Sequence, residues 1–166
     1  MPQNDGKNAP PGLWQRLCAI AEELWIWLFA WIPTPLGVFL RLVFWKPLFK
    51  KCGSARFATG LAMIGCKNMI IGKNTRFGRG SFISAVRGSL VVGDNAAISP
   101  LCHIGADDGS IELGRNVAIG PGTVVRAANH RFSLRDVPIM RQGHVPGRIR
   151  IDDDVWIGAN CQKLLG

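Results

Sequence analysis

Tyrosine, acidic side chains and paired cysteines are scarce in this chain. Its 166 residues include no Tyr, and 11 Asp and Glu stand against 20 Lys and Arg, which gives a formal net charge of +9. The five cysteines are scattered without a Cys-x-x-Cys pair, so free thiols in a reducing compartment are expected in place of a disulfide framework or a zinc module. No small-residue cleavage site follows the first apolar stretch, so a cleaved signal peptide is not predicted and a cytoplasmic protein is expected.

The positive charge by itself indicates neither disorder nor nucleic-acid binding. Hydrophobic residues make up 48% of the chain, which is too many for a disordered basic tail. Aromatic residues are not interleaved with the basic ones in residues 57–166, so side chains that would stack on bases are lacking and no nucleic-acid partner is predicted. Five of the six Trp fall in the first 45 residues instead. The chain is therefore two compositions joined end to end.

An uncharged stretch at residues 24–40 approaches the roughly 20 residues that a helix needs to cross a bilayer. Pro33 and Pro35 interrupt it, so the pattern favours two short helices joined by a proline turn and lying in the membrane interface. Basic residues follow closely, and the lysines among them would lie at an anionic surface. They are Arg41, Lys46, Lys50 and Lys51.

We therefore expect residues 13–51 to bind the membrane surface, peripherally on the cytoplasmic face of the inner membrane. The number of Trp and Phe in this segment exceeds what a small cap can bury. The alternative is that the helices form a packed cap on the rest of the protein, or a contact between subunits.

From residue 57 onward, a large apolar residue recurs at every sixth position and Gly most often follows it. Ile71, Val92 and Leu113 are spaced by 21 residues, which equals three hexads and three extra residues. This period suits neither a helix nor a βαβ array, and it predicts stacked coils with three short faces and one thin core. The predicted inward positions are Ile71, Phe77, Ile83, Val92, Ile98, Ile104, Leu113, Ile119, Val125, Ile151 and Ile157.

One interval breaks the period, because Ile151 follows Leu113 by 38 residues, 17 more than one unit. A loop is thus inserted at one corner, at residues 129–148, and it contains two of the three histidines. Insertions in repeat proteins map to the functional face. The coil that begins at Ile151 should run past Gly166, so the β-helix is expected to be truncated at its carboxyl end.

The predicted organisation has three parts. A disordered tail covers residues 1–12, a helical membrane-interface or capping segment covers 13–56, and the β-helix covers 57–166 with its inserted loop.

These residues resemble the hexapeptide-repeat acyltransferases, in particular the sugar, polysaccharide and xenobiotic O-acetyltransferases. The likeness runs from about residue 64 to the end and rests on the ordered segments GRNVAIGPG, ANHRF, PIMRQG and IDDDVWIGANC. It implies a mainly β fold, a left-handed parallel β-helix, and a homotrimer with active sites between subunits. It also implies acetyl-CoA as donor and, as acceptor, a hydroxyl of a sugar, a polysaccharide or a glycolipid intermediate.

The histidine that opens the extended loop is the general base in that family, and His130 stands at this place. The chemistry needs such a group, because a sugar hydroxyl is a poor nucleophile and an ordinary imidazole, whose pKa is about 6.5, can accept its proton. The resemblance implies direct transfer without an acyl-enzyme. The alternative is that His130 is an ordinary surface histidine of the loop.

Five other positions are candidate site residues. Asn129 and Gln142 match recurrent polar positions of the loop, where they would contact the substrate, although ordinary loop hydrogen bonding is an equal alternative. Trp156 matches a position near the reacting end of the cofactor and should point outward, because it precedes the inward-facing Ile157. Arg148 and Arg150 are candidates for the CoA phosphates, with solvated charge as the alternative.

Several other features receive structural interpretations. His103 lies at the core edge, and the three-histidine zinc site of a γ-type carbonic anhydrase is not matched by the spacing of the histidines. The run from Asp152 to Asp154 occupies a coil corner, so turn chemistry explains it better than calcium, and no required metal is predicted. Ser99 stands where galactoside-type relatives have Asn, which leaves the oxyanion donor unassigned. The alternative function is a non-catalytic, membrane-associated β-helix scaffold.

Overall fold

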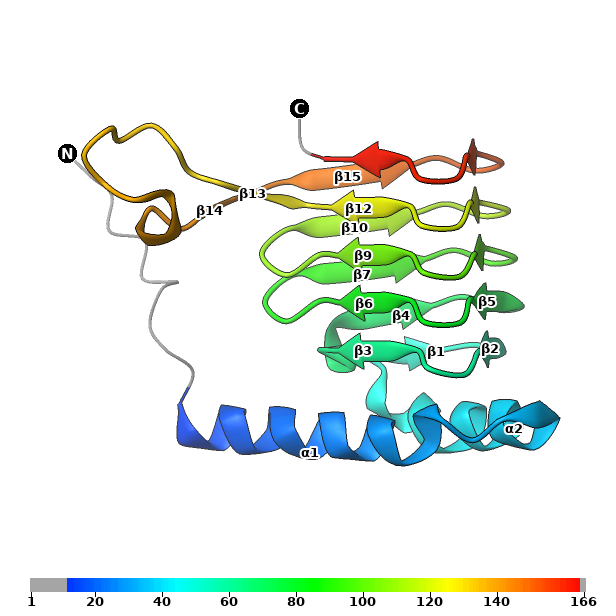
Figure 1. Cartoon of the computed structure of the whole chain (residues 1–166). Helices are drawn as coiled ribbons and strands as arrows, with labels where there is room; N and C mark the ends of the chain where they lie inside the picture. Colours follow the sequence, from blue (N-terminus) through cyan, green and yellow to red (C-terminus); the bar gives the residue numbers. More distant parts are fainter. Residues whose placement is uncertain (1–11, 165–166) are drawn as a thin grey trace.

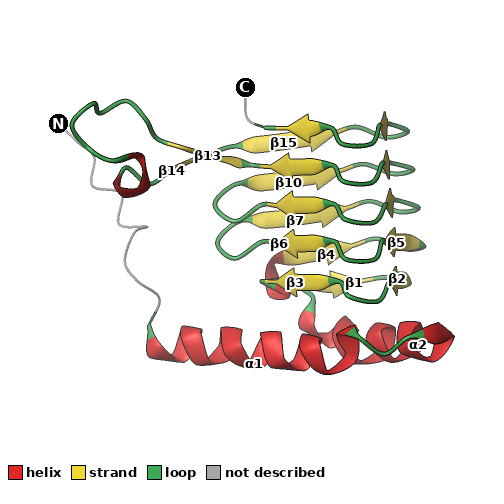
Figure 2. Cartoon of the chain, in the orientation of Figure 1, coloured by secondary structure: helices red, strands yellow, loops and turns green. Residues whose placement is uncertain are grey.

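The computed structural model describes residues 12–164, and the polar tail predicted for residues 1–12 lies outside this range except for Gly12. The chain folds into a left-handed parallel β-helix whose three faces are five-stranded sheets, preceded by two helices. Figure 1 shows the coils stacked above a layer formed by the helices, and Figure 2 shows that strands and turns alternate throughout the stack. This architecture confirms the predicted fold class.

Each face of the solenoid takes one strand from each coil. One sheet contains β1 (Lys51–Cys52), β4 (Met69–Ile71), β7 (Ser89–Val92), β10 (Ser110–Leu113) and β15 (Arg148–Ile151). The second contains β2 (Ala55–Phe57), β5 (Thr75–Phe77), β8 (Ala97–Ile98), β11 (Ala118–Ile119) and β16 (Trp156–Ile157). The third contains β3 (Ala62–Ile64), β6 (Phe82–Ser84), β9 (His103–Gly105), β12 (Val124–Arg126) and β17 (Gln162–Lys163).

The hexad positions form the core. All the predicted inward residues are buried except Ile157, which is partly buried against the same core. The strand register reproduces the period, because Val92 pairs with Ile71 on one side and with Leu113 on the other. Leu113 pairs in turn with Ile151, so the chain re-enters the stack in register after the insertion.

Glycine at the hexad corners allows successive coils to approach closely. A Cβ added at Gly72 would lie 2.7 Å from the backbone N of Asp94, and one at Gly120 would lie 2.6 Å from the backbone N of Ala159. Neither position has positive φ. The requirement for Gly here is therefore the backbone of the next coil.

Asparagines with positive φ stand two residues after Gly72 and after the equivalent glycines of the next two coils. Asn74, Asn95 and Asn116 have φ of 54°, 60° and 59°. Asn adopts this left-handed conformation more readily than most residues because its short polar side chain can bond locally. Here the side chains form a ladder, in which Nδ2 of Asn74 donates to Oδ1 of Asn95 at 3.0 Å and Nδ2 of Asn95 donates to Oδ1 of Asn116 at 3.1 Å.

The β-structure begins at Lys51, before the boundary at residue 57 that the hexad pattern suggests. In this first coil Cys52 pairs with Ile71 and Phe57 pairs with Phe77, at separations of 19 and 20 residues. The shorter and uneven spacing does not match the 21-residue period. For this reason the period did not reveal the first coil.

The helices α1 (Leu13–Ala30) and α2 (Thr34–Trp45) are separated at the predicted proline turn and lie across the end of the first coil (Figure 1). A short 3₁₀ helix at Lys46–Leu48 leads into β1. The helix α1 packs on β3 and α2 packs on β2. Oε1 of Glu22 accepts a hydrogen bond from the backbone N of Cys66 at 2.8 Å. One face of this helical layer is therefore a packed cap.

Arg41 joins the two helices to the solenoid and is completely buried. Its Nε donates to the carbonyl of Phe57 at 2.7 Å, and its Nη1 donates to the carbonyls of Phe29 and Ile32 at 3.0 and 2.8 Å. Phe29 lies in the last turn of α1 and Ile32 follows its C-cap, so the cation complements the negative end of the helix dipole. Burial lowers the pKa of Arg41 from its ordinary value. Of the four basic residues that follow the apolar stretch, this one is inaccessible to a membrane surface.

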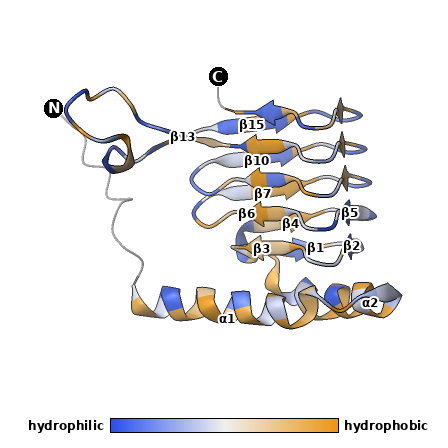
Figure 3. Cartoon of the chain, viewed as in Figure 1, coloured by the Kyte–Doolittle hydropathy of each residue, from blue (hydrophilic) through white to orange (hydrophobic). Residues whose placement is uncertain are grey.

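The other face of the helical layer exposes apolar side chains. Figure 3 shows that apolar residues run along both helices. Trp14, Trp27 and Trp31 are each more than 60% exposed, whereas Trp45 is fully buried against Phe57. Within residues 12–164, neither helix combines the length and the apolar character that a bilayer crossing requires.

Candidate functional site

The inserted segment leaves the solenoid after β12 and forms a two-stranded antiparallel neck before it returns at β15. Its strands are β13 (Ala128–His130) and β14 (His144–Pro146). The loop beyond the neck contains a short 3₁₀ helix at Ile139–Arg141 and projects away from the stack (Figure 1). The neck is anchored by backbone bonds at its base, where Gly147 N donates to the carbonyl of Ala127 at 2.8 Å.

Two histidines face each other across this neck. His130 and His144 are directly opposite in the strand register, with ring centroids 4.3 Å apart and planes inclined by 40°. Both side chains are exposed to solvent. The neck therefore presents a pair of imidazoles on two hydrogen-bonded strands next to the solenoid. A free loop histidine would lack this support.

Two charged residues, Arg87 and Asp108, lie at the same corner of the two preceding coils, and Asp108 approaches the histidine pair. Oδ1 of Asp108 accepts a hydrogen bond from Nε of Arg87 at 2.7 Å, and Oδ2 of Asp108 lies 4.0 Å from Nδ1 of His144. The bond to Asp108 raises the pKa of Arg87. Arg87 and Asp108 were not selected from the sequence, although they are 21 residues apart and Asn129 follows at the same interval. Applying the 21-residue period to the corner between the third sheet and the first would have found them.

Gln142 and Asn129 have different surroundings. Oε1 of Gln142 accepts from the backbone N of Leu134 at 3.1 Å, and its Nε2 donates to the carbonyls of Leu134 and Val137 at 2.9 and 2.7 Å. These bonds hold the inserted loop together, so the amide of Gln142 is already engaged within the protein. Asn129 is exposed on β13, next to His130 and opposite Val145.

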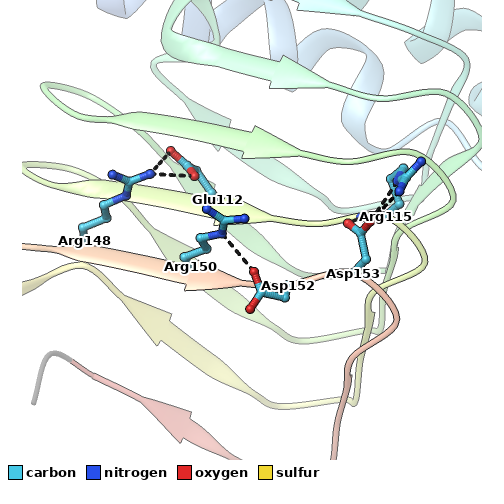
Figure 4. A network of polar contacts seen from close by, with 6 residues as sticks. All are labelled: Glu112, Arg115, Arg148, Arg150, Asp152 and Asp153. Atoms are coloured by element: carbon cyan, nitrogen blue, oxygen red, sulfur yellow. Dashed lines mark hydrogen bonds and ion pairs between the residues drawn. The ribbon is translucent and has the colours of Figure 1, made fainter.

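Arg148 and Arg150 lie on the outer face of β15, and each already has a carboxylate partner (Figure 4). Nη2 of Arg148 donates to both carboxylate oxygens of Glu112 at 2.9 and 3.0 Å, and Nε of Arg150 donates to Oδ1 of Asp152 at 2.9 Å. Both arginines remain more than 60% exposed. A phosphate ligand would therefore compete with or add to these ion pairs.

The Asp152–Asp154 run has the turn role that the repeat predicts. Oδ1 of Asp153 accepts from the backbone N of Arg115 at 2.8 Å, and Asp154 has φ of 60°, like the asparagines before it. The hydrogen bond from that backbone N, followed by the bond from the Arg115 side chain, lowers the pKa of Asp153. Figure 4 shows this pair beside the two arginines of β15.

Trp156 points away from the core and is 79% exposed, as its place beside Ile157 predicts. It lies on β16, in the sheet formed by β2, β5, β8, β11 and β16, whereas His130 leaves the corner between the other two sheets. One chain therefore does not bring Trp156 and His130 to the same face.

A second polar cluster lies on the outer face of β6, β9 and β12. Ser84, Gly105 and Arg126 occupy matched positions on these strands, and a Cβ at Gly105 would lie 3.3 Å from Nε2 of His103 and 3.5 Å from Oδ2 of Asp107. Oγ of Ser84, Oδ1 of Asp107 and Nε of Arg126 are buried and have no hydrogen-bond partner among the described residues. Burial, and then the charge of Arg126, lower the pKa of His103, which stacks edge-on with Phe82.

Comparison of the chain with models of protein families, with curated proteins and with solved structures finds no match. Among residues 12–164, His, Cys, Asp and Glu do not gather in any group of three that could hold a metal ion. The fold, a parallel β-solenoid compatible with the hexapeptide-repeat β-helix, and the histidine pair are thus the observations from which function is inferred.

Proposed function

We propose that the protein is an acetyl-CoA-dependent O-acyltransferase with His130 as the general base. The observation that carries this proposal is the position of His130, which a paired neck holds at the solenoid corner opposite His144. The resemblance of the surrounding segments supports it, because the family has its base at the opening of this same loop.

In the proposed reaction, the neutral His130 ring accepts the proton of an acceptor hydroxyl as its oxygen attacks the thioester carbonyl. The tetrahedral oxyanion collapses to the new ester and expels the CoA thiolate, which takes the proton back from the imidazolium to give free CoA. His144 and Asp108 would position the base and the acceptor beside it. No acyl-enzyme forms, so neither Ser99 nor Cys102 is assigned as a nucleophile.

The proposed acceptor is a sugar, polysaccharide or glycolipid intermediate at the cytoplasmic face of the inner membrane. The exposed apolar face of the helical layer supports the membrane location. A homotrimer is proposed as the active form. Trp156 and His130 lie on different sides of one chain and would meet only if a second subunit contributed one of them.

The test measures release of free CoA by the full chain from acetyl-CoA and candidate glycans. We expect the His130→Ala variant to lose activity by about two orders of magnitude or more, as removal of a general base does. Arg115→Ala, which removes an exposed ion pair at another corner, is the control and should retain activity. Equal rates for the wild type and His130→Ala would reject His130 as the base.

The second candidate function is a membrane-associated scaffold without catalysis. The large exposed apolar face of the helical layer favours it, because this surface serves attachment regardless of chemistry. If the wild type and His130→Ala release no CoA with any acceptor, yet both assemble and bind vesicles, the scaffold is the better description.

A further inference from the structure

A cleft between α1 and β3 is built almost entirely from apolar side chains. Its volume is about 410 Å³, which falls within the usual range for small-molecule sites. Ile20, Leu24 and Trp27 of α1 line one side, and Leu61 and Ala62 of the first coil line the other. Glu23 is the one charged residue among the described residues that line it.

The cleft opens onto the exposed apolar face of the helical layer. Leu24, Trp27 and Trp31 line the cleft and are at the same time 62%, 66% and 64% exposed on this face. At one end, a Cβ on Gly60 would lie 3.3 Å from the ring of Trp31, so this indole closes over the turn before β3. A hydrocarbon chain could therefore enter from the face without crossing a polar barrier.

The apolar face extends across both helices. Its exposed large apolar side chains are those of Leu13, Trp14, Leu17, Ile20, Leu24, Trp25, Trp27, Leu28, Trp31, Leu36, Phe39, Val43 and Phe44. This set combines aliphatic side chains with indoles, which are favoured where a protein meets the headgroup region of a membrane.

The exposed basic residues around this apolar face favour an anionic partner. Lys46, Lys50 and Lys51 are exposed where the helical layer joins the first coil, and Arg16 is exposed near the beginning of α1. The only acidic side chains of the described layer are Glu22, which bonds to the solenoid, and Glu23. An anionic lipid surface complements this rim, whereas a second copy seated face to face would bring the same positive charges together.

We propose that the cleft between α1 and β3 binds the hydrocarbon chain of a membrane lipid while the helical layer lies on an anionic membrane. The proposal rests on the membrane location proposed above and adds a lipid-binding site to it. The cleft lies at the first coil, whereas the catalytic neck leaves after β12, three strand spacings or about 14 Å further along the stack. A lipid held in the cleft would keep its headgroup on the solenoid side of the membrane, below the neck.

The first test measures binding of a neutral fluorescent probe, N-phenyl-1-naphthylamine, by the full chain in the absence of membranes. We expect saturable binding that monomeric dodecyl maltoside displaces. Ala62 is exposed on β3, so Ala62→Phe should fill the cleft without entering the core and weaken binding at least tenfold. Ser89→Phe adds the same ring on the exposed face of β7 and should bind like the wild type. Trp27→Ala, which removes an exposed wall of the cleft, should also weaken binding.

The second test is flotation with vesicles of phosphatidylglycerol and phosphatidylcholine. Phe39→Asp, on the exposed face of α2 and away from the cleft, should reduce flotation several-fold and leave probe binding unchanged. Equal probe binding by the wild type and Ala62→Phe, or no binding by a folded wild type, would overturn the cleft as a site. Absence of flotation would overturn the membrane lipid as its occupant. Neither measurement depends on acetyl transfer, so failure of the catalytic proposal would leave both results unaffected.

Discussion

The solenoid buries its large apolar side chains, whereas the helical layer leaves many of its own exposed. In the coils, the inward residues are covered by the neighbouring coils, and the parallel pairing repeats this cover along the axis. In the helical layer, Ile26, Ala30 and Trp45 are buried, whereas the opposite side is not covered by any of residues 12–164. The same hydrophobic content therefore stabilises the fold in one region and forms a surface in the other.

Arg41 should give the largest loss of stability, because it connects the two regions. In Arg41→Met the carbonyls of Phe29, Ile32 and Phe57 lose their donors in a buried place, and we expect unfolding free energy to fall by about 4 kcal/mol. Urea denaturation measures it. Arg56→Met removes an exposed guanidinium nearby and should change stability little. A similar small loss for both would mean that the buried bonds do not hold the layer to the coil.

The second prediction compares an apolar truncation in each region. Ile104→Ala, in the fully buried core, should cost about 3 kcal/mol of unfolding free energy. Leu28→Ala, at a residue 55% exposed on α1, should cost less than about 0.5 kcal/mol but reduce vesicle flotation. Denaturation and flotation on the same two variants provide the check. Equal destabilisation would show that the apolar face is covered within the protein.

The third prediction concerns the close approach of successive coils, which crowds the backbone at the hexad corners. In Gly78→Ala the new Cβ would overlap the backbone N of Pro100, and we expect a loss of about 2 kcal/mol. Gly158 holds the equivalent hexad position after Ile157, but its Cβ would meet only Sγ of Cys161 at 3.7 Å, an ordinary contact. Thermal unfolding of Gly158→Ala should resemble the wild type. Equal effects of the two substitutions would argue against backbone crowding.

The smallest change in unfolding free energy is expected at the exposed corner where Arg115 forms an ion pair with Asp153. The pKa of the folded Asp153 is lowered, so its contribution to stability is present above the ordinary aspartate pKa and is lost as pH falls through the lowered value. The wild type should thus be slightly more stable than Asp153→Asn near neutral pH, and the difference should vanish in strong acid. Denaturation at several pH values measures this difference, and a constant gap would contradict the assignment.

Much of the solenoid was predictable from particular residues. The spacing of Ile71, Val92 and Leu113 predicted the coils, and the longer interval from Leu113 to Ile151 located the inserted loop. The first coil was not predictable in this way, because Cys52 and Phe57 stand 19 and 20 residues before their partners. Irregular turns change the spacing while the inward direction of the side chains is kept.

The candidate site was predictable only in part. The resemblance made His130 the predicted base, but its pairing with His144 depends on the antiparallel register of a neck that the sequence pattern does not display. Gln142 shows the opposite case. Its match to a recurrent polar position left a substrate contact and loop hydrogen bonding as equal alternatives, and in the structure its amide bonds to the backbone of its own loop. Side-chain type does not tell which of several nearby partners a loop amide will meet.

By itself, the sequence determined the periodic core, the glycine and asparagine corners, the inserted loop and the break between the helices, because each follows from local spacing and backbone preference. Tertiary structure decided which face of each helix meets the coil, that Arg41 is buried while its neighbouring lysines are exposed, and that an apolar cleft lies between α1 and β3. These outcomes depend on contacts between residues that are distant in the chain. Such contacts form only when the helices lie against the end of the first coil, and no local pattern encodes that placement.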